Sequence, residues 1–562
     1  MLARAAGPSQ NVVGNSNRLV FILFAFFFFT LIFFGRLVYL QIIVADDYSA
    51  KAREARTTPG TPGRRGTIYD RSGILLATSV DATTIFANPR EITDVDGTAA
   101  QIAYILGGEY EDYKKRLSQE GTEFVYILRQ ADSELADELK ALKLKGVYFT
   151  PDTKRVYPKG QIGGQVIGFA DIDGRGVSGL ELFYDEVLKG LPGKPSERGR
   201  SGIPIPSEVN VDTLPTNGQD IVISIDYVLQ EYLEARLLKV IADTEGSGGV
   251  AMVMDAATGE IYACASFPLF NPADTSVVEE GATEMKGITE AFEPGSILKT
   301  ATMLAVLESG TLKAGDSLFC PAYLVADEYY VSDASYRGDE TMTLTEILAR
   351  SSNVGISMSA EKLGFPKLYQ YLLDYQLNVA TGVDYPGESK GFLSNSNQWS
   401  LVQSYNVSFG QGIMVTPLQM LSFYGALAND GVACSPHFLI NMPQGEEALS
   451  YPSVKIVKSQ SALSDLLGML ETVVVSGTAS DIYLEGYRVA GKTGTAEYAS
   501  LEGGYEEGLY NVSFIGFLPD SGSQLVCFVG VNEVPGDRKV TKAFQDIMEF
   551  AIERYKIAPS EG

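Results

Sequence analysis

The chain has 562 residues, and its 70 acidic and 44 basic side chains give a formal net charge of −26. This length is sufficient for two or more domains with large hydrophobic cores. The negative charge argues against a nucleic-acid partner, because no basic patch could easily dominate such a field. The four cysteines lack the spacing of a zinc site, although one disulfide among them is compatible with the sequence.

An apolar segment near the N-terminus predicts a membrane anchor. The run over 19–34 resumes at 37–44, after Arg36. A spanning helix needs about 20 apolar residues, which this stretch supplies if Arg36 extends toward the interface. A cleaved signal peptide is the alternative, but its apolar core would be only about 7–15 residues long. We predict a cytoplasmic tail over 1–17 and a transmembrane helix over 18–44.

The remaining chain divides into two predicted domains, 45–215 and 216–562. The first mixes short strands with charged helices and carries no catalytic constellation. The second begins with a strand at 221–226, followed by a helix and an apolar hairpin over 250–263. Two more strand candidates and a closing helix over 541–555 lie near its C-terminus. Strands from both ends with helices between them indicate an α+β architecture.

Ser296 and Lys299 open an apolar, helix-like run. In a helix these positions share one face, so the hydroxyl and the amine can lie within hydrogen-bonding reach. An amine in an apolar setting can lose its proton and act as a base, which activates a serine without histidine. We expect the single histidine, His437, to be structural. We expect a second pair with this spacing, Ser359 and Lys362, to be accidental and to lie on a solvated helix face.

Two further motifs follow along the chain. Ser351 and Asn353 come after a helix-like segment, and Lys492–Thr495 comes after a strand-like segment. Ser-x-x-Lys and Ser-x-Asn are each weak alone, because both recur elsewhere in the chain, whereas Lys-Thr-Gly occurs once. Their order and domain-scale spacing make the combination specific. The trio is the one found in penicillin-binding proteins and class A β-lactamases.

With these residues, the chain resembles a class B penicillin-binding protein, a membrane-anchored D,D-transpeptidase of peptidoglycan synthesis. The segments 65–71 and 179–181 look like its non-catalytic, dimerisation-type pedestal, and 408–412 looks like its transpeptidase domain. The segment 293–295, directly before Ser296, resembles the division and sporulation branch of this family more closely than its elongation branch. The resemblance implies an elongated, mixed α/β pedestal and a β-lactamase-like transpeptidase domain, with an antiparallel sheet flanked by helices.

The resemblance also implies roles for single residues. Ser296 would attack the D-Ala–D-Ala carbonyl of a donor stem peptide, with Lys299 as the base and D-alanine as the leaving group. Ser351 would relay a proton to the leaving amine, and Asn353 would hold both the donor and Lys299. Lys492 would supply positive charge near the substrate carboxylate. The hydroxyls of Thr493 and Thr495 would bind that carboxylate. The backbone N–H groups of Ser296 and Thr495 would form the oxyanion hole. Gly494 would let the strand edge approach the substrate closely.

The same resemblance implies no metal or organic cofactor. The implied partners are stem peptides, β-lactams that mimic the donor, a polytopic glycan polymerase and other wall-synthesis or divisome membrane proteins. It also implies a single-pass protein of the cell membrane with an extracytoplasmic catalytic domain. A D,D-carboxypeptidase or β-lactamase, in which water accepts the acyl group, and a non-catalytic wall-synthesis scaffold or penicillin sensor are the alternatives. The long pedestal favours the transpeptidase.

Overall fold

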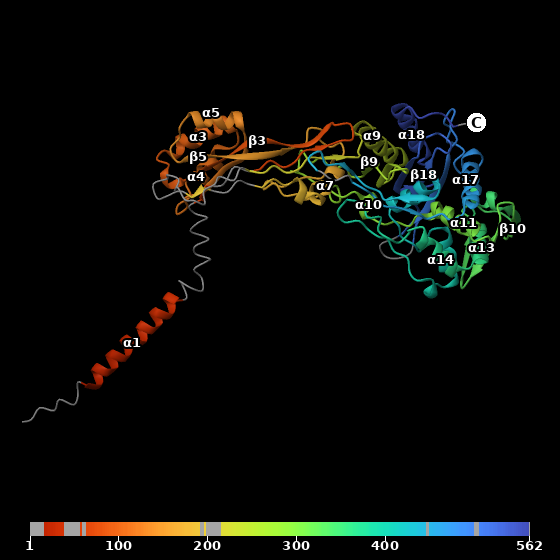
Figure 1. Ribbon diagram of the computed structural model, residues 1–562, viewed down its shortest axis with the longest axis horizontal. Coiled ribbons are helices and arrows are strands. Elements are labelled where there is room, and N and C mark those ends of the chain that lie inside the picture. The colour runs from red at the N-terminus through yellow and green to blue at the C-terminus, as the bar shows by residue number, and fades with distance from the viewer. Residues whose placement is uncertain are drawn as a thin grey trace, which may run out of the picture. The chain divides into compact units, whose positions relative to one another are not determined.

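The computed structural model describes residues 16–38, 57–58, 63–191, 196–197, 215–445, 449–499 and 505–560. Most of the predicted tail over 1–17 therefore lies outside the described residues. The chain forms two compact units, 1–62 with 192–215, and 63–191 with 216–562 (Figure 1). The described elements of the first unit are helix α1 (Ser16–Val38) and an antiparallel pair of strands, β1 (Thr57–Thr58) and β6 (Ser196–Glu197).

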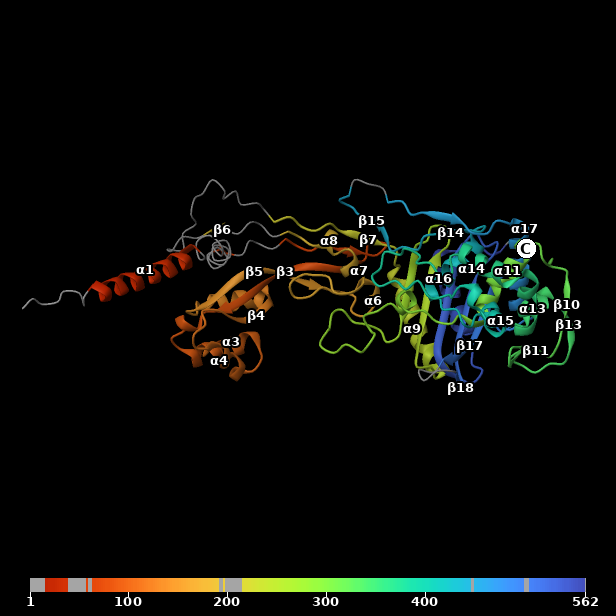
Figure 2. The ribbon, with the colours of Figure 1, turned by 90° about the horizontal axis from the view of Figure 1, so that it is seen from below.

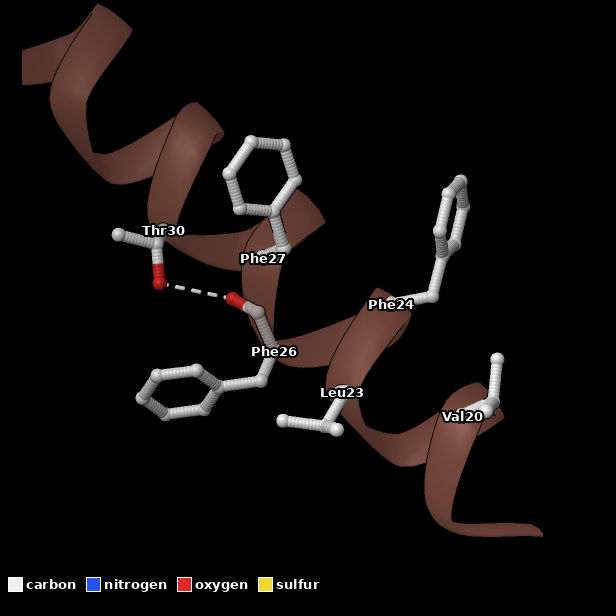
Figure 3. Close-up of a pocket in the computed structure, with 6 residues that line it drawn as sticks. All are labelled: Val20, Leu23, Phe24, Phe26, Phe27 and Thr30. Carbon is white, nitrogen blue, oxygen red and sulfur yellow. Dashed lines mark hydrogen bonds between the residues drawn. The ribbon is translucent and has the colours of Figure 1, made fainter. Parts of the chain in front are cut away.

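The described side chains of α1 are mostly apolar and exposed. Phe21 and Phe33, for example, are 74% and 75% exposed. Figure 3 shows six side chains that line a shallow pocket on this one helix, where the Thr30 hydroxyl donates to the Phe26 carbonyl at 2.7 Å. Within the residues that the structure describes, no helix is long and apolar enough to cross a membrane. The span over 18–44 therefore stays a prediction.

The N-terminal part of the second unit is built around β3 (Leu75–Ala87). This strand follows β2 (Ile68–Tyr69) after a turn and is antiparallel to it. Its second half lies between β4 (Val125–Asp132) and β5 (Val147–Val156). Buried apolar side chains of these strands share a core with three helices. The helices are α3 (Val95–Leu106), α4 (Tyr110–Leu117) and α5 (Ser133–Ala141).

A buried ion cluster fixes the segment that leads into β2. Each oxygen of the Glu181 carboxylate accepts from one arginine, Arg65 at 2.5 Å and Arg155 at 2.6 Å. Glu181 lies on the short helix α7 (Gly179–Phe183) and is fully buried. Arg65 also donates to Asp185 at 2.6 Å. Since buried charges require partners, these contacts tie three segments of this part together.

Two short strands from later in the chain extend the same sheet. β7 (Ile221–Ile223) runs parallel to β2, and β15 (Leu439–Asn441) is antiparallel to β7. The strand predicted at 221–226 therefore exists, but it joins the sheet of the N-terminal part. Its two isoleucines are fully buried there, which explains the apolar pattern.

The C-terminal part contains a five-stranded antiparallel sheet in the order β17-β18-β19-β8-β9. Its strands β17 and β18 are labelled in Figure 2. Its strands are β8 (Gly248–Asp255), β9 (Ile261–Ser266), β17 (Ala490–Ala499), β18 (Tyr505–Phe517) and β19 (Leu525–Pro535). Helices α9 (Tyr227–Thr244) and α18 (Thr541–Tyr555) pack on one face, and α10 (Lys286–Thr289) and α16 (Pro417–Ala428) pack on the other. The predicted α+β class, hairpin and closing helix are confirmed.

A helical subregion lies beyond the β17 edge of this sheet in both views (Figures 1 and 2). Its central helix, α11 (Lys299–Glu308), is buried at every position up to Leu307, as expected of a helix with other helices around it. The neighbouring helices are α12 (Leu344–Ala349), α13 (Asn353–Leu363), α15 (Leu401–Phe409) and α17 (Gln460–Val475). The three sequence motifs meet between this subregion and β17.

Candidate active site

Ser296 lies in a 3-10 turn, η4 (Gly295–Leu298), directly before α11. The turn packs closely on β17, because a Cβ on Gly295 would lie 3.1 Å from the Thr495 carbonyl oxygen. Gly295 adopts φ of 53°, and its N–H donates to the Gly410 carbonyl at 2.9 Å. A glycine is favoured there by the backbone conformation. These contacts leave the Ser296 side chain half-buried beside the strand.

The Lys299 side chain is 1% exposed and contacts Ser351 and Asn353, the residues of the second sequence motif. Its amine donates to the Ser351 carbonyl at 2.5 Å, to the Ser351 hydroxyl at 3.1 Å and to Asn353 Oδ1 at 2.7 Å. Burial lowers the pKa of Lys299 to about 7, and the Asp333 carboxylate opposes this effect. A large fraction of this amine is therefore neutral near pH 7, as a general base requires.

The Ser296 hydroxyl and the Lys299 amine do not form the hydrogen bond that their spacing in the sequence allows. Within the described part of the chain, the Ser296 hydroxyl has no hydrogen-bond partner, while the Lys299 amine is bound to Ser351 and Asn353. The spacing of the pair allows this contact but does not enforce it. The Lys299 amine lies at the end of a long side chain, which places it against the Ser351 carbonyl and Asn353 instead. Catalytic hydrogen bonds often form only with substrate bound, so this geometry is compatible with a Ser296–Lys299 dyad.

Ser351 occupies the short connection between α12 and α13 in a left-handed conformation, with φ of 60°. Its hydroxyl accepts from Lys299 at 3.1 Å and from Lys492 at 3.0 Å. Two amines thus converge on one oxygen. Burial and the neighbouring Lys299 amine together lower the pKa of Lys492, which is fully buried.

Residues Lys492–Thr495 lie on β17, the outermost strand in the sheet order. The Thr493 hydroxyl is hydrogen-bonded to Thr478 at 2.6 Å, and Thr495 is exposed. A Cβ on Gly494 would lie 2.1 Å from Ser513 Oγ and 3.1 Å from Ile297 Cγ2. Gly494 therefore leaves room for Ser513 of the neighbouring strand and for Ile297 of the Ser296 turn, and its expected role in the approach of substrate stays a prediction.

The other sequence-selected residues lie in different environments. Ser359 is fully buried and donates to the Gly355 carbonyl at 2.8 Å, whereas Lys362 is exposed. This second pair does not meet, but its serine is not on a solvated face as expected. The His437 ring stacks on Tyr451 with centroids 3.5 Å apart, in agreement with a structural role. All four cysteines are free, and no group of three His, Cys, Asp or Glu side chains in the described ranges could hold a metal ion.

Sequence reasoning missed the residues that hold Asn353. The amide nitrogen of Asn353 donates to the Ser332 carbonyl at 3.0 Å, and Asp333 accepts from Ser352 and from the backbone N–H of Val354. Both contacts come from the end of a hairpin of β11 (Tyr323–Ala326) and β12 (Tyr329–Ser332). No spacing pattern links this hairpin to the second motif, so only the folded chain could identify it.

Two families of known proteins match this chain, one over its N-terminal part and one over its C-terminal part. The family described as penicillin binding protein transpeptidase domain matches residues 249–549, and the family described as penicillin-binding protein dimerisation domain matches residues 60–223. Stage V sporulation protein D of Bacillus subtilis (strain 168) is 32% identical over 538 residues, which cover 92% of this chain and 82% of that protein.

Two further comparisons agree with these matches. The peptidoglycan D,D-transpeptidase FtsI of Buchnera aphidicola subsp. Schizaphis graminum (strain Sg) is 30% identical over 548 residues, which cover 95% of this chain and 94% of that protein. The crystal structure of penicillin binding protein 3 from Mycobacterium tuberculosis in complex with aztreonam has a TM-score of 0.69 at 25% identity, covering 89% of this chain and 98% of that one.

Proposed function

This chain belongs to the class B penicillin-binding proteins and is a peptidoglycan D,D-transpeptidase, and we propose that it works through an acyl-enzyme on Ser296. The observation that supports this best is the buried Lys299 amine, held at Ser351 and Asn353 one helical turn after Ser296. No histidine contributes to this site. Burial lowers the pKa of this lysine to about 7, which suits it to act as the base for Ser296.

In the first step, Ser296 Oγ attacks the carbonyl carbon of the D-Ala–D-Ala peptide bond and its proton passes to the neutral Lys299 amine. A positioned base contributes about 10²–10⁴-fold to such a step. The tetrahedral oxyanion accepts hydrogen bonds from the backbone N–H groups of Ser296 and Thr495. Support for this pairing comes from the close packing of the Gly295 turn on Thr495. Each such donor is worth about 10²–10³-fold.

The intermediate then collapses, the peptide C–N bond breaks, and D-alanine leaves as an amine after receiving a proton. Ser351 is suited to relay this proton, because its hydroxyl is hydrogen-bonded to both Lys299 and Lys492. The acceptor amine of a second stem peptide attacks the resulting ester, loses a proton and releases Ser296. Two stem peptides are thereby joined by a new amide bond.

The donor carboxylate would bind beside Lys492, Thr493 and Thr495. Burial and the Lys299 amine lower the pKa of Lys492 in the free protein. A bound carboxylate would raise that pKa again, since an opposite charge favours the charged form. Lys492 would thus supply its positive charge when substrate is present. The outer edge of β17 offers backbone groups to an extended donor peptide, as in strand addition.

Intact-mass spectrometry of the protein with and without benzylpenicillin tests the acyl-enzyme. We expect a stable mass increase equal to the drug, absent in Ser296→Ala and present in the matched control Ser359→Ala, whose serine belongs to the second Ser-x-x-Lys pair. Rapid drug turnover without an adduct would instead indicate a β-lactamase. No adduct in folded wild-type protein would indicate a scaffold.

A second assay separates transpeptidation from carboxypeptidation. A synthetic peptide ending in D-Ala–D-Ala is incubated with the protein and an excess of a D-amino acid as acceptor. Exchange of the terminal D-alanine for the acceptor supports transpeptidation. Release of D-alanine without exchange would show that water is the acceptor and would contradict the proposed reaction.

We also propose that residues 18–44 anchor the chain in the cell membrane, with the catalytic domain outside. The apolar runs over 19–34 and 37–44 and the exposed phenylalanines of α1 support this placement. A polytopic glycan polymerase and other divisome or wall-synthesis proteins would bind through the anchor and the pedestal. Membrane fractionation of the full chain and of residues 45–562 tests the anchor. Recovery of the full chain in the soluble fraction would contradict it.

A further inference from the structure

Asp333 follows β12 and is hydrogen-bonded to the residues on both sides of Asn353, Ser352 and Val354. Its two carboxylate oxygens lie 3.0 Å and 2.9 Å from the Ser352 hydroxyl, which donates to them. Oδ1 also accepts from the backbone N–H of Val354 at 2.9 Å. Val354 is the second residue of α13, and a carboxylate is stabilised at a helix N-terminus. Asp333 therefore fixes the position at which this helix begins.

The preceding residue, Ser332, fixes the orientation of the Asn353 side chain. Its carbonyl oxygen accepts from Asn353 Nδ2 at 3.0 Å. An amide has its donors on one side and its acceptor on the other, so this bond turns Asn353 Oδ1 toward the Lys299 amine, 2.7 Å away. Ser332 and Asp333 together thus contact three successive residues at the start of α13.

Arg337 holds Asp333 from the opposite side. Its Nε donates to Asp333 Oδ2 at 2.6 Å, and the two side chains are only 15% and 11% exposed. The same guanidinium donates to the Cys320 and Gly338 carbonyls, both at 3.0 Å. Arg337 therefore ties the carboxylate to a second pair of strands, β10 (Ser317–Cys320) and β13 (Glu340–Thr343). A mostly buried pair of this kind keeps the carboxylate in one place.

We propose that Asp333 is a positioning residue of the transpeptidase, which holds Asn353 and Ser351 against the Lys299 amine. The proposal rests on the function proposed above. Asp333 makes no hydrogen bond to Ser296 or Lys299, so it acts through the residues at the start of α13. Loss of its hydrogen bonds would free this segment to move, and a 1 Å displacement of reacting groups can lower a rate by about 10²-fold.

Asp333 also acts on Lys299 through its charge. The charged groups that face the Lys299 amine are Lys492 from β17 and Asp333 from the hairpin end. Burial lowers the pKa of Lys299, and the Asp333 carboxylate raises it. Removal of that carboxylate leaves burial and Lys492 unopposed, so the pKa of Lys299 would fall further. A purely structural role for Asp333 would not produce this shift.

The test measures acylation of the full-length protein in detergent by a fluorescent penicillin, between about pH 6 and pH 9. Asp333→Asn keeps one acceptor oxygen, for Ser352 and Val354, but removes the charge and the acceptor for Arg337. We expect the plateau rate constant to fall about 10–10²-fold and the midpoint of the pH profile to move to lower pH. The matched control, Glu328→Gln, neutralises an exposed carboxylate in the turn of the same hairpin and should behave as wild type.

A wild-type rate and an unshifted midpoint in Asp333→Asn would overturn the proposal. A lower thermal unfolding midpoint with unchanged acylation would overturn it too, because it would show a structural role only. If Asp333→Asn does not fold, Arg337→Lys replaces it, with a lower plateau rate expected and a wild-type rate overturning the proposal. A wild-type protein that is folded but not acylated would instead overturn the proposed function and this inference with it.

Discussion

The Lys299 amine donates to the carbonyl oxygen of Ser351 at 2.5 Å, and the Ser351 backbone is left-handed with φ of 60°. A non-glycine residue in this conformation stores roughly 1–3 kcal/mol and persists only where its surroundings hold it. Here the conformation turns both the carbonyl and the hydroxyl of Ser351 toward one amine. The strained residue therefore lies at the centre of the candidate active site, where it positions the Lys299 amine.

The first prediction concerns the pH dependence of acylation. Burial lowers the pKa of Lys299 to about 7, against the effect of the Asp333 carboxylate. Because the neutral amine is the base, we expect the acylation rate constant with a penicillin to rise about tenfold per pH unit below pH 7 and to level off above it. Stopped-flow fluorescence measures this profile, with circular dichroism as the control for folding. A rate independent of pH in this range would exclude Lys299 as the base.

The second prediction concerns Gly494. In Gly494→Ala the new Cβ would lie 2.1 Å from Ser513 Oγ and 3.1 Å from Ile297 Cγ2, so the Ser513 side chain or β17 must shift. We expect a loss of about 1–3 kcal/mol in the free energy of unfolding and a fall in acylation rate of about 10²-fold. Ser513→Ala removes the nearest atom. The double variant should therefore recover part of both losses, as urea unfolding and acylation assays would show, whereas strictly additive losses would contradict this packing argument.

The third prediction concerns the buried charges of the N-terminal part. Glu181→Gln would leave Arg155 buried without a counter-charge and Arg65 with Asp185 as its remaining partner, and we expect it to cost about 3–5 kcal/mol of stability. The control is Asp81→Asn. Its pair with Arg64 is exposed, at 69% and 51%, and we expect a loss of about 0–1 kcal/mol. Equal shifts of the urea unfolding midpoint in the two variants would contradict the role of burial.

The fourth prediction concerns Glu234, which is 3% exposed. One carboxylate oxygen accepts from the Gly163 N–H and from Gln230, while the other has no partner among the described residues. Burial raises the pKa of Glu234 to about 7, from an ordinary value of 4.5. The folded state thus binds this proton more tightly, so its contribution to stability is complete below pH 4.5 and is lost as pH rises to about 7.

Glu234→Gln should therefore be more stable than wild type at pH 8, by about 1–3 kcal/mol, and should lose this advantage near pH 4.5. Urea unfolding at several pH values measures the difference. Asp243→Asn, at an exposed position on the same helix, is the control and should leave the pH dependence unchanged. A Glu234→Gln variant with the wild-type pH dependence would show that Glu234 does not titrate in this range.

Much of the architecture follows from local patterns in the sequence. Apolar runs around a Thr-Gly turn predicted the β8–β9 hairpin, and the helix predicted over 541–555 has those bounds in the structure. The motifs also predicted that Ser296, Lys299 and Lys492 lie in one site. That prediction came from the family resemblance, which depends on the residue types and their order along the chain. These features depend on contacts between near neighbours or on motifs that can be read without coordinates.

Only the tertiary structure decided how those residues meet. Lys299 is bound by Ser351 rather than by Ser296, and Gly494 is required by Ser513, a residue of the next strand. The Asp333–Arg337 pair that supports Asn353 has no sequence signature at all. The contacts of Lys299 with Ser351 and of Asp333 with Val354 join segments that the folding of the chain brings together from separate positions. Local periodicity predicts which face of a helix or strand is buried. Which residues that face contacts is determined by the packing of the whole domain.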